Sequence, residues 1–137
     1  MASAADKIEA SPSSLAFSTS ERNKTLSLDI EVSNTGDFTE NVSFAFEGVD
    51  SKYNAKLLDG TTSVTAFTPI PESAKKFKVS IFVPKDEPSG KKDIGNLKVT
   101  FVRKDGGGSV QTLIIPLTLD VPSMLEIDKI VARVKEK

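Results

Sequence analysis

The feature that most constrains the fold is a strict alternation of apolar and polar residues between Thr25 and Phe46. The apolar positions of the first arm are Leu26, Leu28, Ile30 and Val32, and those of the second arm are Val42, Phe44 and Phe46. Such a period of two is typical of β-strands with one buried face and one wet face. Between the arms, residues 34–37 read Asn-Thr-Gly-Asp, which favours a turn. We therefore expect two strands that fold about this turn as a hairpin.

The composition excludes several classes of function. The chain has 137 residues, which is enough for one domain, and its net charge of -1 provides no field to attract nucleic acid or an anionic membrane. It has no Cys and no His, so it lacks a disulfide, a thiolate nucleophile and the commonest general base and metal ligand. No apolar run reaches the eighteen or so residues of a membrane span. We expect a non-enzymatic protein without cofactor or metal, and we interpret Met1–Ala5 as the start of an excised fragment.

Further alternating segments follow along the chain. The first, Ile8–Phe17, is interrupted at Ser11-Pro12-Ser13, where we expect the strand to switch edges because proline donates no ladder hydrogen bond. The other expected strands cover residues 52–58, 61–67 as a short edge, 75–83, 97–101 and 113–119. A surface loop at 84–90 extends to about residue 95, and 104–109 form a hairpin loop. These signals predict an all-β fold, an Ig-like antiparallel β-sandwich of about seven strands with Greek-key topology.

The expected domain organisation has three parts. Residues 1–7 are expected to be disordered, residues 8–121 to form the sandwich, and residues 122–137 to be a linker and the first element of a following module. The apolar positions from Leu125 to Val134 fit either a helix or a strand with one bulge, and we favour the strand.

Two detailed predictions follow from placing residues 25–32 antiparallel beside residues 75–83. Ile30 should lie opposite Phe77, Leu28 opposite Val79 and Leu26 opposite Ile81, which sets Glu31 against Lys76 and Asp29 against Lys78. The expected core contains Leu28, Ile30, Phe44, Val79, Ile81, Val99, Phe101 and Ile115.

Several motifs together resemble a known family. They are Ser11–Leu15, the segment Val32–Asp37, and the loop Val83–Gly90 followed by Gly95–Thr100. Over residues 8–121 the chain resembles the Ig-like modules repeated in archaeal surface-layer and bacterial cell-adhesion-related proteins. It departs from them at Lys91–Ile94, where the family often has an aromatic residue. A second resemblance, to PapD-like and major-sperm-protein sandwiches, rests on Ser13–Phe17 and Lys52-Tyr53.

The first resemblance implies a structural or adhesion module of a larger surface protein, located outside the cell. Such a module acts as a spacer and as a docking surface for neighbouring domains or other surface proteins. One alternative is an accessory carbohydrate-binding module of a secreted enzyme. The other, implied by the second resemblance, is a cytoplasmic PapD-like adaptor that binds a partner strand.

Candidate site residues are few. Oxygen ligands for calcium occur at Asn34, Asp37, Asp50, Asp59, Asp86 and Glu87, but no Asp-x-Asp spacing is present, so we favour plain turn roles. Carbohydrate binding would need an aromatic platform, for which Phe38 and Phe82 are the candidates. The sequons at Asn23 and Asn41 are candidate glycosylation sites if the chain is secreted. The glycine-rich loop 104–108 precedes a strand rather than a helix, which argues against phosphate binding.

Overall fold

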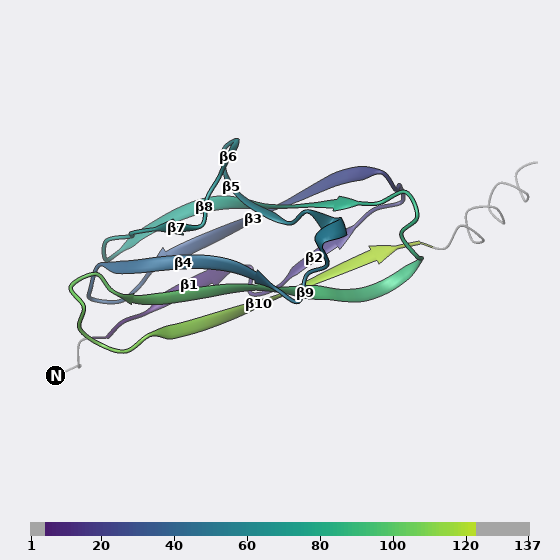
Figure 1. The fold of residues 1–137 in the computed structure, drawn as a ribbon. Helices are drawn as coiled ribbons and strands as arrows, with labels where there is room; N and C mark the ends of the chain where they lie inside the picture. Colours follow the sequence, from purple (N-terminus) through teal and green to yellow (C-terminus); the bar gives the residue numbers. More distant parts are fainter. Residues whose placement is uncertain (1–4, 123–137) are drawn as a thin grey trace, which may run out of the picture.

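The computed structural model describes residues 5–122 and consists of two five-stranded sheets packed face to face (Figure 1). One sheet has the strand order β1-β3-β8-β5-β6 and the other the order β2-β10-β9-β4-β7. The strands are β1 (Ile8–Ser11), β2 (Leu15–Ser18), β3 (Lys24–Asn34), β4 (Glu40–Glu47), β5 (Lys56–Asp59), β6 (Thr62–Ser63), β7 (Ala66–Phe67), β8 (Ser73–Val83), β9 (Gly90–Arg103) and β10 (Gln111–Val121), with a 3-10 turn η1 (Ser51–Tyr53) before β5. The prediction of an all-β, Ig-like sandwich is confirmed.

The predicted register between β3 and β8 is confirmed pair by pair. Ile30 lies opposite Phe77, and the same alignment places Glu31 opposite Lys76 and Asp29 opposite Lys78. Of the two oppositely charged pairs, Lys78 and Asp29 form an ion pair of 3.9 Å. The alternation of apolar and polar residues was sufficient to predict this register, because a shift by one residue would turn the apolar side chains toward solvent.

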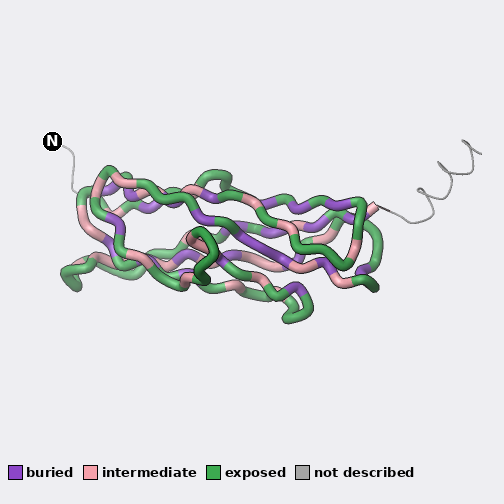
Figure 2. Tube along the Cα trace, turned by 90° about the horizontal axis from the view of Figure 1, so that it is seen from above, coloured by how far each residue is buried: buried purple, intermediate pink, exposed green. Residues whose placement is uncertain are grey.

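The predicted core is also confirmed, since seven of its eight residues are buried and Leu28 is half-buried against them. Figure 2 shows that buried residues follow the strands while the exposed ones gather at turns and outer faces. Phe44 and Phe77 of this core and the half-buried Phe67 contact one another at ring-centroid distances of 5.1–5.7 Å.

The expected hairpin over residues 25–46 is wrong. β3 and β4 belong to opposite sheets, so the chain crosses the sandwich between them instead of turning back within one sheet. Asn34 fixes this crossing: its side-chain amide donates to the carbonyls of Phe38 and Pro69, and its Oδ1 accepts from the Gly36 amide. An alternating pattern identifies a strand but not its partner. Here the first arm, β3, pairs with β8, and the second arm, β4, pairs with β9.

The expected switch at Pro12 is confirmed. β1 pairs antiparallel with β3 in one sheet, whereas β2 pairs parallel with β10 in the other. The segment expected as a short edge at 61–67 makes a similar change, since β6 is an edge of the first sheet and β7 an edge of the second.

Three segments differ from expectation in detail. Tyr53 does not alternate within a strand but is the buried residue of η1. β9 begins at Gly90 rather than after residue 95, because a bulge between Leu117 and Thr118 of the β10 pairing absorbs Ile94 and lets one long strand continue. Residues 5–7, placed above in a disordered segment, are held by hydrogen bonds to residues 35–37. Residues 1–4 and the segment 123–137, with its strand-or-helix question, lie outside the described residues.

Candidate functional site

The most distinctive surface is the outer edge of the first half of β10. Every residue of β10 pairs with β9 on one side. On the other side, β2 pairs only with residues 117–120 of β10. Within the described residues, 111–116 are therefore paired on one side only. The cause is the strand switch at Pro12, which takes the preceding chain, β1, away from β10 and into the other sheet. At about 3.3 Å per residue, the unpaired stretch is about 20 Å long.

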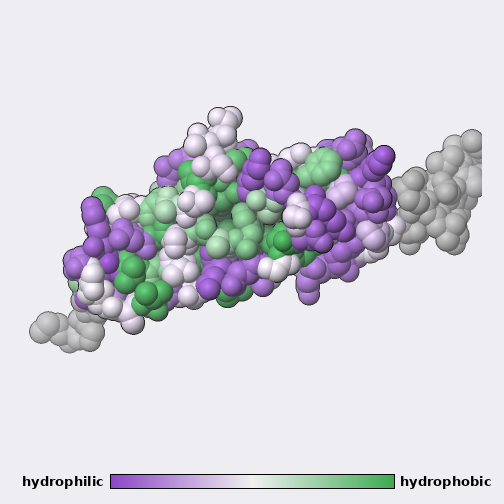
Figure 3. Space-filling model, in the orientation of Figure 1, coloured by the Kyte–Doolittle hydropathy of each residue, from purple (hydrophilic) through white to green (hydrophobic). Residues whose placement is uncertain are grey.

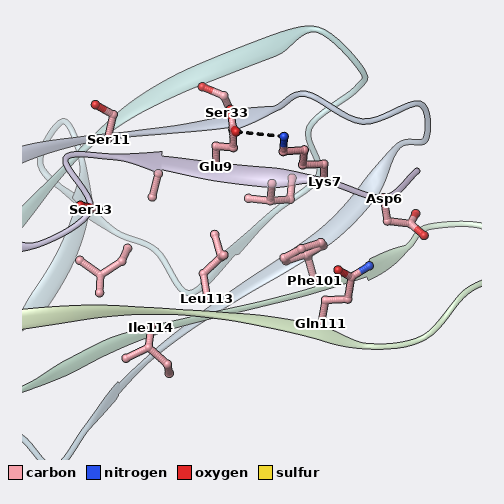
Figure 4. A pocket seen from close by; sticks show the side chains of 13 residues that line it. Asp6, Lys7, Glu9, Ser11, Ser13, Ser33, Phe101, Gln111, Leu113 and Ile114 are labelled. Atoms are coloured by element: carbon pink, nitrogen blue, oxygen red, sulfur yellow. Dashed lines mark ion pairs between the residues drawn. The ribbon is translucent and has the colours of Figure 1, made fainter. Parts of the chain in front are cut away.

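A groove runs beside this edge, between β1 of one sheet and β10 of the other. Its volume is about 560 Å³. Figure 4 shows the side chains of Leu113 and Phe101 pointing into the space between the two strands, while Ile114 points away on the other side of β10. Ile115 and Phe101 are buried, whereas Leu113 is half-buried. The groove thus combines an apolar floor with a strand edge whose backbone groups lack a partner strand.

Exposed apolar residues mark the same region. Among the described residues, the large exposed ones are Val110 at 63%, Ile70 at 62% and Ile114 at 49% exposure; Val110 directly precedes β10 and Ile114 belongs to it. Figure 3 shows a broad apolar patch over the middle of this face and a smaller one at the end where β9 and β10 meet. Pro116 in the same stretch is a residue that strands tolerate mainly at edges.

One end of the groove is closed by residues 5–7, which we call the N-terminal strap. The Thr35 and Asp37 amides donate to the carbonyls of Lys7 and Ala5, at 3.0 and 2.8 Å. The strap lies directly on Gly36, where a Cβ would approach the Ala5 carbonyl oxygen to 2.6 Å. Asp6 and Lys7 of the strap line the groove, so the position of the strap sets the width of this end.

Asp6 of the strap, Glu40 of β4 and Arg103 of β9 form a charged cluster. Arg103 Nε donates to both carboxylate oxygens of Asp6 at 2.9 Å, which lowers the pKa of Asp6. The Arg103 guanidinium also stacks on the Phe38 ring at 3.6 Å from its centroid. Glu40, which faces Arg103 across β4 and β9, is fully buried, and no donor group reaches either of its carboxyl oxygens. The Asp6 carboxyl lies within hydrogen-bonding reach, but only a protonated carboxyl can donate to the other. Burial, followed by the neighbouring Asp6, raises the pKa of Glu40 to about 7.

A second buried carboxylate, Glu87, fixes the loop before β9. Its Oε2 accepts from the Tyr53 hydroxyl at 2.8 Å and from Lys92 Nζ at 2.6 Å, and Lys52 Nζ lies 3.3 Å from Oε1 as an ion pair without a well-aligned hydrogen bond. Burial alone would raise the pKa of Glu87, but these cationic and hydroxyl partners outweigh it and hold the pKa below its usual value. Burial and Glu87 together raise the pKa of Tyr53. This cluster joins η1 to the loop and has a structural role.

The calcium candidates are dispersed, and most of them already have protein partners. Asn34 is used by the crossing loop, Asp50 accepts from the Lys52 amide as the cap of η1, and Asp59 forms an ion pair with Lys75 at 2.8 Å. Asp37 accepts from the Ala5 amide at 2.7 Å. Asp86 is exposed beside the buried Glu87. Within residues 5–122, no three acidic side chains gather as ligands for a metal ion.

The remaining candidates are also accounted for by position. Phe38 lies after the end of β3 and is covered by Arg103, whereas Phe82 pairs with Thr25 at the other end of that strand, so the two rings form no shared platform. The side chains of Asn23 and Asn41 are both exposed. The glycine-rich loop joins β9 to β10 as a hairpin, as expected. In the part of the chain that the structure describes, no helix has the length and apolar character needed to cross a membrane.

Glu40 and the free β10 edge are absent from the sequence-based candidates for site residues, and Glu87 is considered there only as a possible calcium ligand for which a plain turn role is favoured. Charged residues in a sequence are normally solvated, and nothing local distinguishes a buried glutamate. Two prolines in the sequence do indicate the edge. Pro12 predicts the strand switch, and Pro116 lies within a later strand, where proline is tolerated mainly at an edge.

Comparisons with known proteins identify the fold. No family model matches the sequence, and no curated protein matches it significantly. Among solved structures, the seventh PapD-like domain of human CEP192 is 14% identical, with a TM-score of 0.62 over 85% of this chain and 87% of that one. The YadV chaperone is 10% identical with a TM-score of 0.63, and the match covers 85% of this chain but only 52% of the chaperone. SSP-19, an MSP-domain-like protein of Caenorhabditis elegans, is 13% identical with a TM-score of 0.58 over 82% and 98% of the two chains.

These neighbours agree with the second resemblance drawn from the sequence, and the relation to surface-layer and adhesion modules stays a prediction. The chain spans about half of the YadV chain, and identities of 10–14% support a statement about architecture alone. The chain therefore has the Ig-like sandwich fold of PapD-like and major-sperm-protein domains.

Proposed function

We propose that the chain is a non-catalytic protein-docking module that binds an extended segment of a partner protein along residues 111–116 of β10. The observation that carries the proposal is the one-sided pairing of this stretch beside an apolar groove. Unpaired strand edges are sites at which another chain can add a strand. Pro116 removes one amide donor at the end of the stretch, and residues 111–115 keep theirs.

The geometry defines the kind of partner. A segment added to β10 would place alternate side chains on opposite faces, one set toward Leu113 in the groove and the other beside Ile114 on the outer face. Backbone hydrogen bonds would contribute about 0.5–1.5 kcal/mol each, and the apolar contacts would select the register. The ionic groups of the groove are paired internally, Lys7 with Glu9 and Asp6 with Arg103. We therefore infer an uncharged segment with alternating apolar residues.

The wider role that we propose is that of a spacer and docking module of a larger extracellular surface protein. In Figure 1 the described chain enters the sandwich at one end and β10 finishes at the opposite end, an arrangement that suits serial linkage. Exposed sequon asparagines are compatible with a secreted protein. A chaperone among the fold neighbours is in keeping with protein docking. Expression in a glycosylating secretory host tests this part: a mass shift lost in Asn23→Gln or Asn41→Gln supports it, and secretion without any shift leaves the sequons without a role.

Selection from a phage-displayed library of random 12-residue peptides on the full chain tests the docking site. We expect selected peptides to alternate in hydrophobicity and to lose at least tenfold in affinity for Ile114→Lys, which places a charge beside the edge. Ile70→Lys is the matched control, because Ile70 is similarly exposed but lies outside β10. Ala66→Lys tests β7, the other edge of the same sheet. Peptides that bind Ile114→Lys unchanged, or that are lost on Ala66→Lys, would refute the proposed site.

A further inference from the structure

The chain carries a buried acidic pair whose position suggests control over the groove, and the following inference rests on the docking function proposed above. Glu40 and Asp6 are neighbouring carboxyl groups from different sheets: Glu40 begins β4, and Asp6 belongs to the strap that leads into β1. Arg103 is committed to Asp6 through both of its carboxylate oxygens. Glu40 is left without a partner of opposite charge and without solvent.

Hydrogen-bond chemistry restricts what this pair can do. Two carboxylates are acceptors only, so neighbouring carboxyl oxygens can bond to each other only when one of them carries a proton. A neutral Glu40 can donate that proton to Asp6. An ionised Glu40 would instead be a buried charge beside a like charge, which is unfavourable in a low-dielectric interior.

The strap is the element able to respond. It is attached to residues 35–37 by two backbone hydrogen bonds and by the Ala5 amide, which donates to the Asp37 carboxylate, and it is attached to β9 by the Asp6–Arg103 pair. It continues into β1, an edge strand with only one neighbour. The charged groups that act on Glu40 are Asp6 from the strap, Arg103 at the end of β9 and Asp105 in the β9–β10 loop. Movement of the strap would separate Glu40 from Asp6 and admit water, whereas β4 and β9 are held in the middle of their sheet.

We propose that Glu40 is a protonation switch for the strap: neutral Glu40 holds residues 5–7 against residues 35–37, and ionised Glu40 releases them and widens one end of the docking groove. The switch regulates access to the same edge that the partner segment would use. The switch requires a change in pH and no ligand other than the partner segment.

The expected pH range follows from the raised pKa of Glu40, which is about 7 against an ordinary value of 4.5. Because the closed form binds the proton more tightly, it is favoured at low pH and loses this advantage as the pH rises through 7. If opening restores the ordinary value, the ratio of open to closed strap rises about tenfold between pH 6 and pH 8.

Hydrogen exchange followed by NMR tests the switch without any partner. The reporters are the amides of Thr35 and Asp37, which donate to the strap carbonyls. We expect their protection factors, corrected for intrinsic exchange, to fall about tenfold from pH 6 to pH 8 in the wild type and to stay constant in Glu40→Gln. Glu47→Gln is the matched control, because it removes an exposed carboxylate at the other end of β4, away from the strap, and should leave the pH dependence intact.

Titration of the Glu40 side-chain carboxyl carbon in the wild type gives a second measurement that needs no variant. Coincident midpoints for Glu40 and for the Thr35 and Asp37 amides support the switch, even if Glu40→Gln fails to fold. Constant protection in the wild type, the same pH dependence in Glu40→Gln, or separate midpoints would overturn it. Failure of the peptide selection would refute docking while leaving these strap measurements intact, so the two proposals can fail independently.

Discussion

Replacing the buried Glu87 by glutamine should destabilise the domain by about 3 kcal/mol. Glu87 is 2% exposed and holds three partners at once. Hydrogen bonds to charged groups contribute about 1.5–3 kcal/mol each, and removing one member of a buried ion pair typically costs about 3–5 kcal/mol. We take a value at the low end because Lys52 and Lys92 retain 43% and 27% side-chain exposure and can be partly rehydrated.

Urea unfolding at pH 7 measures the effect, which for a domain near this size corresponds to about 10 °C in Tm. Asp86→Asn is the matched control, since it removes the neighbouring exposed charge and should change stability by less than about 0.5 kcal/mol. The lowered pKa of Glu87 means that its contribution is present above its ordinary value of 4.5 and is lost as the pH falls through its folded-state pKa. The gap between wild type and Glu87→Gln should therefore narrow in acid. A loss equal to that of Asp86→Asn would refute the reasoning.

Two further variants test the core and the domain boundary. Phe101→Ala should cost about 3–5 kcal/mol in urea unfolding, because Phe101 is 3% exposed between the sheets, and a loss under about 1 kcal/mol would contradict its assigned face. Deletion of residues 123–137 should scarcely move the thermal midpoint and should abolish any concentration-dependent association seen by light scattering, if this segment belongs to a following module. A fall of about 10 °C would place the segment within this domain instead.

The alternation of apolar and polar residues was sufficient to locate the strands and to predict the β3–β8 register. It was insufficient to predict which strands pair with each other. The β3–β8 alignment was predictable because both strands alternate without interruption and only one alignment matches their charges as well as their apolar faces. The pairing of β3 with β4 was predicted wrongly, because adjacency in sequence favours a hairpin. The crossing between sheets depends on Asn34, whose amide reaches Pro69, a residue 35 positions away.

The candidate site was predictable only through its prolines. Pro12 indicates the strand switch, and the switch leaves residues 111–116 unpaired, but the sequence does not say that β10 is the strand left without a neighbour. Glu40 and Arg103 lie 63 positions apart, and their meeting with Asp6 depends on the packing of two sheets. A buried, unpartnered glutamate has no local signature, because its environment is made entirely by distant residues.

Amide exchange across β10, with and without a selected peptide, tests the central claim most directly. In the free chain, the described pairing predicts less amide protection for residues 111–115, which have one neighbouring strand, than for residues 117–120, which have two. Saturating peptide should raise protection within 111–116 and leave β7 unchanged. Protection gained at β7, or at neither edge, would contradict the account.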